Sequence, residues 1–188
     1  MLTRILITIG LAAMLGVSGP ALAQRQSDGD ALVEAIRKED GNKAMDLLES
    51  NPRLVNSRDD KGETGLIIAL RRSDPDWTGV LLRSGADVEL AGRDGDTPLV
   101  LATRVGFADA VSWLLGLGAK VDSTNKMGET ALIVAVQSRN ARLVRTLLAA
   151  KADPDKTDYA GYSARDYAKR DNRSRQMSEI IEAAKPKG

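Results

Sequence analysis

The pattern of apolar and polar positions along this 188-residue chain repeats itself every 33 residues. Adjacent aliphatic residues mark the register at Leu81-Leu82, Leu114-Leu115, Leu147-Leu148 and Ile180-Ile181. Three more columns keep the same spacing: Gly62, Gly95, Gly128 and Gly161; Thr64, Thr97, Thr130 and Ser163; and Ala69, Ala102, Ala135 and Ala168. An earlier copy around Ala35 and Leu47-Leu48 is joined by a link one residue longer. The period predicts a row of similar stacked units.

Each unit is predicted to hold two short helices joined by tight turns. The recurring glycine suits a turn that needs a positive φ, and the Thr or Ser two residues later can cap a helix. The alanine column marks a place where two helices approach too closely for a larger side chain. Asp74 and Pro75 then suit the start of a second helix, and Gly85 suits its left-handed end.

Two stretches of this pattern resemble the ankyrin repeat: Asp94-Gly95-Asp96-Thr97-Pro98-Leu99, and Leu81-Leu82-Arg83-Ser84-Gly85-Ala86-Asp87-Val88. The resemblance covers roughly residues 28–184. It implies an all-α solenoid of helix–turn–helix units with short hairpin loops. The repeats are expected at about 27–58, 59–91, 92–124, 125–157 and 158–184, within a domain of 24–184, followed by a disordered tail at 185–188.

Several positions depart from the family pattern. The family's usual His is replaced by Ile67, Val100, Ile133 and Asp166, so we expect aliphatic packing in its place. Lys151 and Pro154 stand where Gly85 and Val88 stand two units earlier, which predicts an irregular fourth turn. Arg165 replaces a leucine, as expected for a last repeat whose outer face meets water.

The first 23 residues read as a secretory signal peptide. Arg4 precedes an apolar run from Ile5 to Val17, and Ala21-Leu22-Ala23 forms a small-x-small cleavage site before Gln24. The run is short for a membrane span, although an uncleaved anchor is the alternative. We therefore expect a periplasmic or secreted protein with no membrane anchor after cleavage.

Composition narrows the function classes. The chain carries 27 Lys+Arg against 26 Asp+Glu, and removal of the leader with Arg4 leaves the mature chain neutral, which argues against nucleic-acid binding. It contains no Cys and no His. Cys-based or His-based zinc sites, haem held by His, Cys nucleophiles and His relays are therefore excluded. We expect no enzyme activity, no cofactor, no metal and no catalytic residues.

Three weaker patterns in the sequence could indicate catalysis, calcium binding or ligand stacking, but each has a simpler structural explanation. Ser123 and Lys126 match a Ser-x-x-Lys pattern, but they fall on a linker and hairpin. Asp153, Asp155 and Asp158 suggest a calcium loop, yet the glycine and glutamate that such a loop needs are missing. Trp77 and Trp113 lie on second helices, where packing is the better interpretation and ligand stacking the alternative.

One charge pattern recurs with the repeat. A basic column at the end of the first helices contains Arg37, Arg71, Arg104 and Arg170, with Gln137 in the fourth unit and Lys38 and Arg72 extending it. A hairpin column contains Glu63, Asp96, Glu129 and Tyr162. The resemblance places the basic column on the concave side. Solvation with mutual ion pairing across the groove is the simpler explanation of the pattern, and a surface that selects a partner is the functional one. If the groove does not bind, Tyr159 and Tyr162 near the C-terminal end offer another surface.

We therefore expect a non-catalytic module that binds a protein partner through this charged groove. Arg37, Arg71, Arg72, Arg104, Arg170, Glu63, Asp96, Glu129 and Tyr162 are the candidate contact residues. The arginines are expected to matter more for binding than for folding. The alternative function is a protective or chaperone-like envelope factor that supports a periplasmic enzyme, and a hydrolase is the least favoured class.

Overall fold

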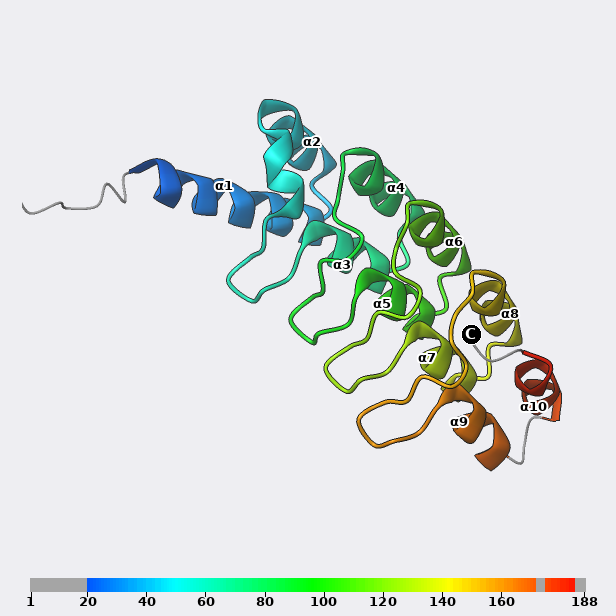
Figure 1. The fold of residues 1–188 in the computed structure, drawn as a ribbon. Coiled ribbons are helices and arrows are strands. Elements are labelled where there is room, and N and C mark those ends of the chain that lie inside the picture. The colour runs from blue at the N-terminus through cyan, green and yellow to red at the C-terminus, as the bar shows by residue number, and fades with distance from the viewer. Residues whose placement is uncertain (1–19, 172–174, 185–188) are drawn as a thin grey trace, which may run out of the picture.

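The computed structural model describes residues 20–171 and 175–184, and within them the chain is a row of five helix pairs (Figure 1). The pairs are α1 (Pro20–Arg37) with α2 (Gly41–Ser50), α3 (Gly65–Arg71) with α4 (Pro75–Arg83), α5 (Pro98–Arg104) with α6 (Ala108–Gly116), α7 (Ala131–Gln137) with α8 (Ala141–Ala149), and α9 (Ala164–Arg170) with α10 (Arg175–Glu182). A 3₁₀ turn, η1 (Pro52–Asn56), follows α2. The predicted all-α repeat fold is confirmed.

The first helices of the pairs form an inner row and the second helices form an outer row (Figure 1). Within the inner row α3 packs on α1 and α5, and α7 packs on α5 and α9. Each inner helix also packs on the outer helix of its own pair. The hairpin loops between successive pairs project on the same side of the stack. Surface residues on neighbouring loops are therefore held side by side.

The local signals in the sequence act as predicted. Gly62, Gly95, Gly128 and Gly161 adopt φ of 77°, 83°, 78° and 84° in the hairpins. The hydroxyls of Thr64, Thr97 and Thr130 each accept the amide hydrogen of the residue three positions on. Ser163 and Asp166 form a complete capping box at the last inner helix. The caps satisfy amides that the first helical turn leaves without partners.

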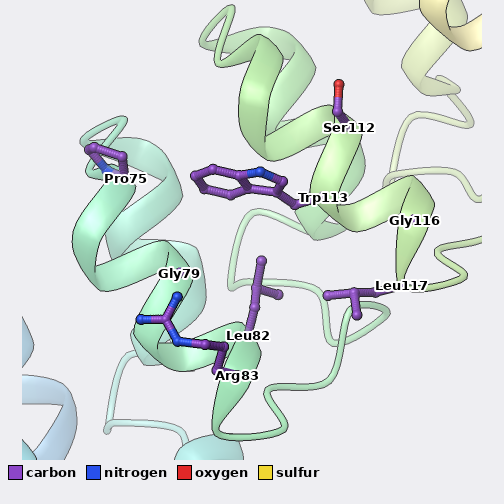
Figure 2. A pocket seen from close by; sticks show the side chains of 8 residues that line it. All are labelled: Pro75, Gly79, Leu82, Arg83, Ser112, Trp113, Gly116 and Leu117. Atoms are coloured by element: carbon purple, nitrogen blue, oxygen red, sulfur yellow. The ribbon is translucent and has the colours of Figure 1, made fainter.

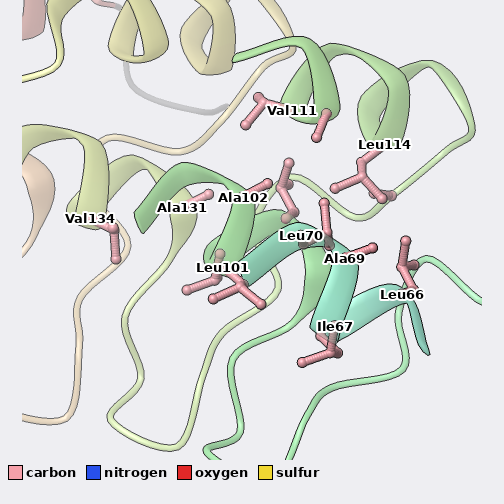
Figure 3. Close-up of a cluster of buried hydrophobic side chains, with 14 of the residues drawn as sticks. Leu66, Ile67, Ala69, Leu70, Leu101, Ala102, Val111, Leu114, Ala131 and Val134 are labelled. Atoms are coloured by element: carbon pink, nitrogen blue, oxygen red, sulfur yellow. The ribbon is translucent and has the colours of Figure 1, made fainter. Parts of the chain in front are cut away.

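The core runs the length of the stack between the two helix rows. Ala69, Ala102, Ala135 and Ala168 are at most 1% exposed, as the alanine column predicts (Figure 3). Ile67, Val100 and Ile133 at the family's histidine position are also at most 1% exposed. Aliphatic packing thus takes the place of that side chain. Because each unit buries its apolar face on its neighbours, the stack is stabilised by interfaces between units.

The prediction of an irregular fourth turn is wrong. Lys151 adopts φ 68°, the left-handed conformation that Gly85 and Gly118 adopt at φ 86° and 88°. The amides of Lys151 and Ala152 donate to Leu148 and Leu147 at 3.0 Å each, and the same two bonds close the earlier turns. The hydrogen bonds of the helix end therefore hold a lysine in a backbone conformation that favours glycine.

The expectation for Arg165 also needs correction. Its side chain is only 16% exposed and pairs with Asp155 at 2.6 Å. The guanidinium donates to the carbonyls of Ile181 at 2.6 Å and Ala184 at 2.5 Å. These carbonyls lie at the C-terminal end of α10, where the helix has acceptors without partners and a negative dipole end. Arg165 therefore caps the last helix rather than facing water.

The ends of the chain lie mostly outside this description. The proposed leader falls on residues 1–19 outside the described residues, together with the tail at 185–188. Helix α1 begins at Pro20, so it includes Ala21-Leu22-Ala23 and starts before residue 27, where the first repeat was expected. Among the residues described, no helix has both the length and the apolarity needed to span a bilayer.

Candidate protein-binding surface

The hairpin loops project on one side of the stack (Figure 1), and side chains at the C-terminal ends of α1, α3 and α5 reach acids on these loops. We name the loops and these helix ends, with the corresponding ends of α7 and α9, the hairpin surface. Arg37, Arg71, Arg104 and Arg170 are the last residues of their helices, where a cation complements the helix dipole. Side chains near the N-terminal end of this surface line a depression of about 270 Å³ that includes Arg37, Glu63 and Arg71. The two charge columns of the sequence thus meet on one surface.

The contacts of Arg104 show how the columns interact. Its Nε donates to Asp96 at 2.8 Å, and its Nη2 donates to Glu129 on the next hairpin at 3.0 Å. The Asn125 amide donates to Asp96 at 3.0 Å and to Glu129 at 2.8 Å, closing the network. The hydrogen bonds with Asp96 and Glu129 raise the pKa of Arg104, although partial burial opposes them. Arg104 therefore links two neighbouring hairpins.

Arg71 and Arg37 make equivalent links nearer the N-terminus. Arg71 pairs with Glu63 at 3.1 Å and with Asp94 on the next hairpin at 3.3 Å. Arg37 pairs with Glu34 at 2.8 Å and with Asp59 on the following hairpin. Burial alone would raise the pKa of Asp59, but hydrogen bonds from Arg37 and from backbone amides outweigh it and lower that pKa.

Arg72 has a different role from its neighbour. Its guanidinium donates to the carbonyls of Ile36, at 3.1 Å, and of Arg37, and it pairs with Glu39 at 3.3 Å. These carbonyls belong to the C-terminal end of α1. Arg72 therefore ties α3 to the previous helix pair.

These contacts change the expectation for two of the candidate residues. Glu63 and Glu129 are buried, at 4% and 8% exposure, so removal of their arginine partners leaves carboxylates poorly solvated. We therefore expect Arg71 and Arg104 to contribute to folding, beside the role in binding that the sequence predicts for them. The interpretation as mutual ion pairing accounts for this part of the hairpin surface.

The C-terminal end of the hairpin surface is built differently. Gln137 takes the arginine position in α7. The Tyr167 hydroxyl donates to Asp158 at 2.6 Å, and its ring meets Tyr162 edge-on at 5.8 Å between centroids. The Arg170 guanidinium lies 4.5 Å from the centre of the Tyr162 ring. Within the described part of the chain Arg170 forms no ion pair.

Two exposed apolar side chains stand at the tips of the last hairpins. Tyr159 is 79% exposed and Met127 is 57% exposed, and the Tyr159 amide donates to the Met127 carbonyl at 3.0 Å. Sequence reasoning missed Met127. The repeat register could have identified it, because the same position holds the charged residues Lys61 and Asp94 on earlier hairpins and an apolar residue only at Met127 among these three. We name Met127, Tyr159, Tyr162 and Arg170 the C-terminal patch.

The weaker candidates for chemistry have structural contacts. The Ser123 hydroxyl donates to the Lys120 carbonyl at 2.8 Å, while the Lys126 ammonium donates to the Arg93 carbonyl at 2.6 Å. Asp153 and Asp158 accept backbone amides of their own turns. Among the side chains described, no cluster of acidic residues is arranged to hold a metal ion.

Comparison with known proteins agrees with this architecture. A search of curated proteins finds no match to the chain. A family model described as ankyrin repeats, in three copies, matches residues 32–125 and also residues 66–158. Together the two matches cover more than half of the chain, and they extend from within α1 to the end of the turn after α8. The chain therefore belongs to the ankyrin-repeat family.

Proposed function

We propose that this chain is an exported, non-catalytic module that binds one protein partner on its hairpin surface, with the C-terminal patch as the main contact. Ankyrin repeats generally bind protein partners and are typically without catalytic activity. The partner's identity is open, and its chemistry is inferred from the patch.

The observation that carries this proposal is the difference in available side chains along the hairpin surface. Arg71 and Arg104 already bind acids of this chain, whereas Tyr159 and Met127 are 79% and 57% exposed. Tyrosine and arginine are enriched among the residues that dominate the energetics of protein interfaces, and tyrosine buries a large area at little entropic cost. The patch therefore offers contact area that the paired arginines do not.

The patch also indicates what the partner presents. Tyr159 and Met127 suit an apolar side chain, and the guanidinium of Arg170 over Tyr162 suits a carboxylate. A standard interface buries about 800 Å² on each side, so the partner reaches beyond the patch onto neighbouring hairpins.

The test is a crosslinking pull-down with a matched pair of double variants. Met127→Ala with Tyr159→Ala removes the apolar tips. Lys61→Ala with Asp60→Ala changes the same two register positions on one earlier hairpin, two units before Met127 and three units before Tyr159, where the side chains are also exposed. We expect the first variant to lose a partner that the second retains, with both melting like the parent. If both variants retain the partner, or both lose it equally, the proposal is wrong. Capture of many unfolded chains instead of one partner favours the chaperone-like alternative.

Export is the second part of the proposal. It is supported by the apolar run after Arg4, by the Ala21-Leu22-Ala23 site and by the absence of cysteine, which avoids wrong disulfides in an oxidising compartment. Intact-mass analysis of fractionated cells tests it, and a protein that begins at Gln24 outside the cytoplasm is expected. A full-length protein in the membrane fraction, or in the cytoplasm, would overturn it.

A further inference from the structure

A second surface lies on the outer helix row, between α4 and α6. A groove of about 570 Å³ opens there, lined by Pro75, Gly79, Leu82, Arg83, Ser112, Trp113, Gly116 and Leu117. In Figure 2 Trp113 extends from α6 toward α4, and Leu82 and Leu117 lie below it. All of these residues belong to the outer helices or their ends, away from the hairpin surface.

The groove exists because two glycines face it. Gly79 on α4 corresponds by the 33-residue register to Ser112 on α6 and to Arg145 on α8. A Cβ built on Gly116 would meet no atom within 4 Å, so that side of the groove is open space. The next outer pair, α6 with α8, has Thr146 where Trp113 stands and Ala150 where Leu117 stands. The aromatic groove is therefore specific to one position in the stack.

The lining is apolar and exposed. Trp113 is 38% exposed and Leu117 is 56% exposed. Phe107 packs edge-on against Trp113, with 5.9 Å between the ring centroids, and this contact supports the indole across the groove. Contiguous exposed apolar side chains of this kind mark interaction sites on soluble proteins.

Positively charged side chains near the groove favour an occupant that carries carboxylates. Arg83 lies at the C-terminal end of α4 with its guanidinium over Gly79, and it forms no ion pair with any residue that the structure describes. Arg145 on the neighbouring α8 is likewise without an ion pair within residues 20–171 and 175–184. The acids of these helices, Asp76 and Asp109, lie in the first turns, at the opposite helix ends from Arg83. A desolvated carboxylate placed beside Arg83 would gain a charge-assisted hydrogen bond.

We propose that the groove between α4 and α6 docks an acidic, leucine-rich amphipathic segment of a partner protein, with an aliphatic side chain on Trp113 and a carboxylate on Arg83. This inference rests on residues separate from the C-terminal patch. The module then holds two contact surfaces on opposite helix rows, and loss of one leaves the other intact.

The fluorescence of Trp113 tests the proposal directly. The chain has two tryptophans, so Trp77→Phe leaves Trp113 as the reporter. The probe is an acetylated and amidated peptide of about 14 Ala, Leu and Glu residues, with leucines at helical spacing, and the matched peptide has Lys for Glu. We expect a saturable blue shift with the Glu peptide and about tenfold weaker binding of the Lys peptide.

Two variants and one control sharpen the result. Arg83→Glu is expected to weaken the Glu peptide about tenfold and to reverse the preference toward the Lys peptide. Gly116→Leu fills the groove and is expected to abolish binding without lowering the melting temperature. Arg53→Glu changes another exposed arginine, in η1, without an ion pair among the described residues, and should leave binding unchanged.

Three results overturn the inference. The first is an unshifted Trp113 spectrum with both peptides. The second is equal affinity for both peptides, or no effect of Arg83→Glu. The third is a different occupant: self-association in sedimentation that Gly116→Leu removes, or dodecanoate binding that depends on Arg83 while the peptide does not bind.

Discussion

The same arginine column acts differently in the middle of the stack and at its C-terminal end. Arg71 and Arg104 each bridge their own hairpin to the next one through acids of this chain. Arg170 follows the last hairpin among the residues that the structure describes, and it lies over the Tyr162 ring. A repeated arginine therefore links neighbouring hairpins where a following hairpin is described, and is available for other contacts at the last described pair.

The middle and the C-terminal end of the hairpin surface also differ in how deeply their side chains are buried. Acids in the middle, such as Glu63 and Glu129, are buried, so removal of an arginine partner costs more stability there than it would at an exposed ion pair. Side chains at the end, such as Tyr159, are exposed. Stability and binding are thus expected to depend on different hairpins.

Charge reversal in the middle has the largest expected effect. Changing Arg71→Glu and Arg104→Glu together places new acids beside Glu63, Asp94, Asp96 and Glu129. We expect a loss of about 2–4 kcal/mol in the free energy of unfolding, because buried carboxylates lose their partners and gain like charges. Urea titration measures it. Arg170→Glu at the end is the matched control and should cost less than about 1 kcal/mol; equal losses would remove the distinction between the two regions.

Packing offers a second comparison between the middle and the end. Ala102 on α5 lies between α3 and α7, whereas Ala168 on α9 has a neighbouring inner helix on one side only among those described. We expect Ala102→Leu to cost about 1–3 kcal/mol and Ala168→Leu to cost less, because the end can relax outward. Ala141→Leu, at a half-buried site at the start of α8, is the control with the smallest change. Identical urea midpoints for all three would contradict the assigned register.

Most of the fold could be predicted from the sequence because each structurally required residue type recurs at the same position in several repeats. The hairpin glycines, the capping threonines and the close-packed alanines each recur at one position, so their roles are predicted by sterics and hydrogen bonding alone. Other links between units escape this reasoning. Asn56, Glu89 and Asp122 each accept the amide of a residue in the next unit, at 2.7–2.8 Å, yet no single residue type marks that position.

The surface was only partly predictable. Sequence register brings the arginine and acid columns to one face, as the structure shows, but it does not reveal which acids are buried or which carboxylate each arginine reaches. Met127 and the groove at Trp113 were missed because their meaning depends on what is absent nearby: a charge at one hairpin tip, and side chains at Gly79 and Gly116. Burial and empty space are properties of the assembled stack.

Acid sensitivity at the C-terminal end gives a smaller test. Although burial opposes it, hydrogen bonds from the Tyr167 hydroxyl and from backbone amides lower the pKa of Asp158. This contribution to stability is complete above the unfolded value of about 3.9 and is lost as pH falls through the lower folded pKa. Tyr167→Phe should therefore cost about 1 kcal/mol at pH 7, with the gap narrowing as pH falls below the unfolded value of about 3.9 and through the lower folded pKa. Urea midpoints against pH measure it, and Tyr159→Phe, with an exposed ring, should show no gap at any pH.

The smallest expected effect is a gain at the fourth turn. Lys151 holds φ 68° where Gly85 and Gly118 hold similar values, and the hydrogen bonds of the three helix ends are the same. A side chain with a Cβ costs about 1 kcal/mol in this left-handed conformation, so Lys151→Gly should stabilise the stack by about 0.5–1 kcal/mol despite the greater freedom of glycine in the unfolded chain. Gly118→Lys is the reciprocal change and should destabilise by a similar amount. Thermal melts of the two variants decide the matter: a loss on Lys151→Gly would mean that the lysine side chain makes a stabilising contact that outweighs its backbone strain.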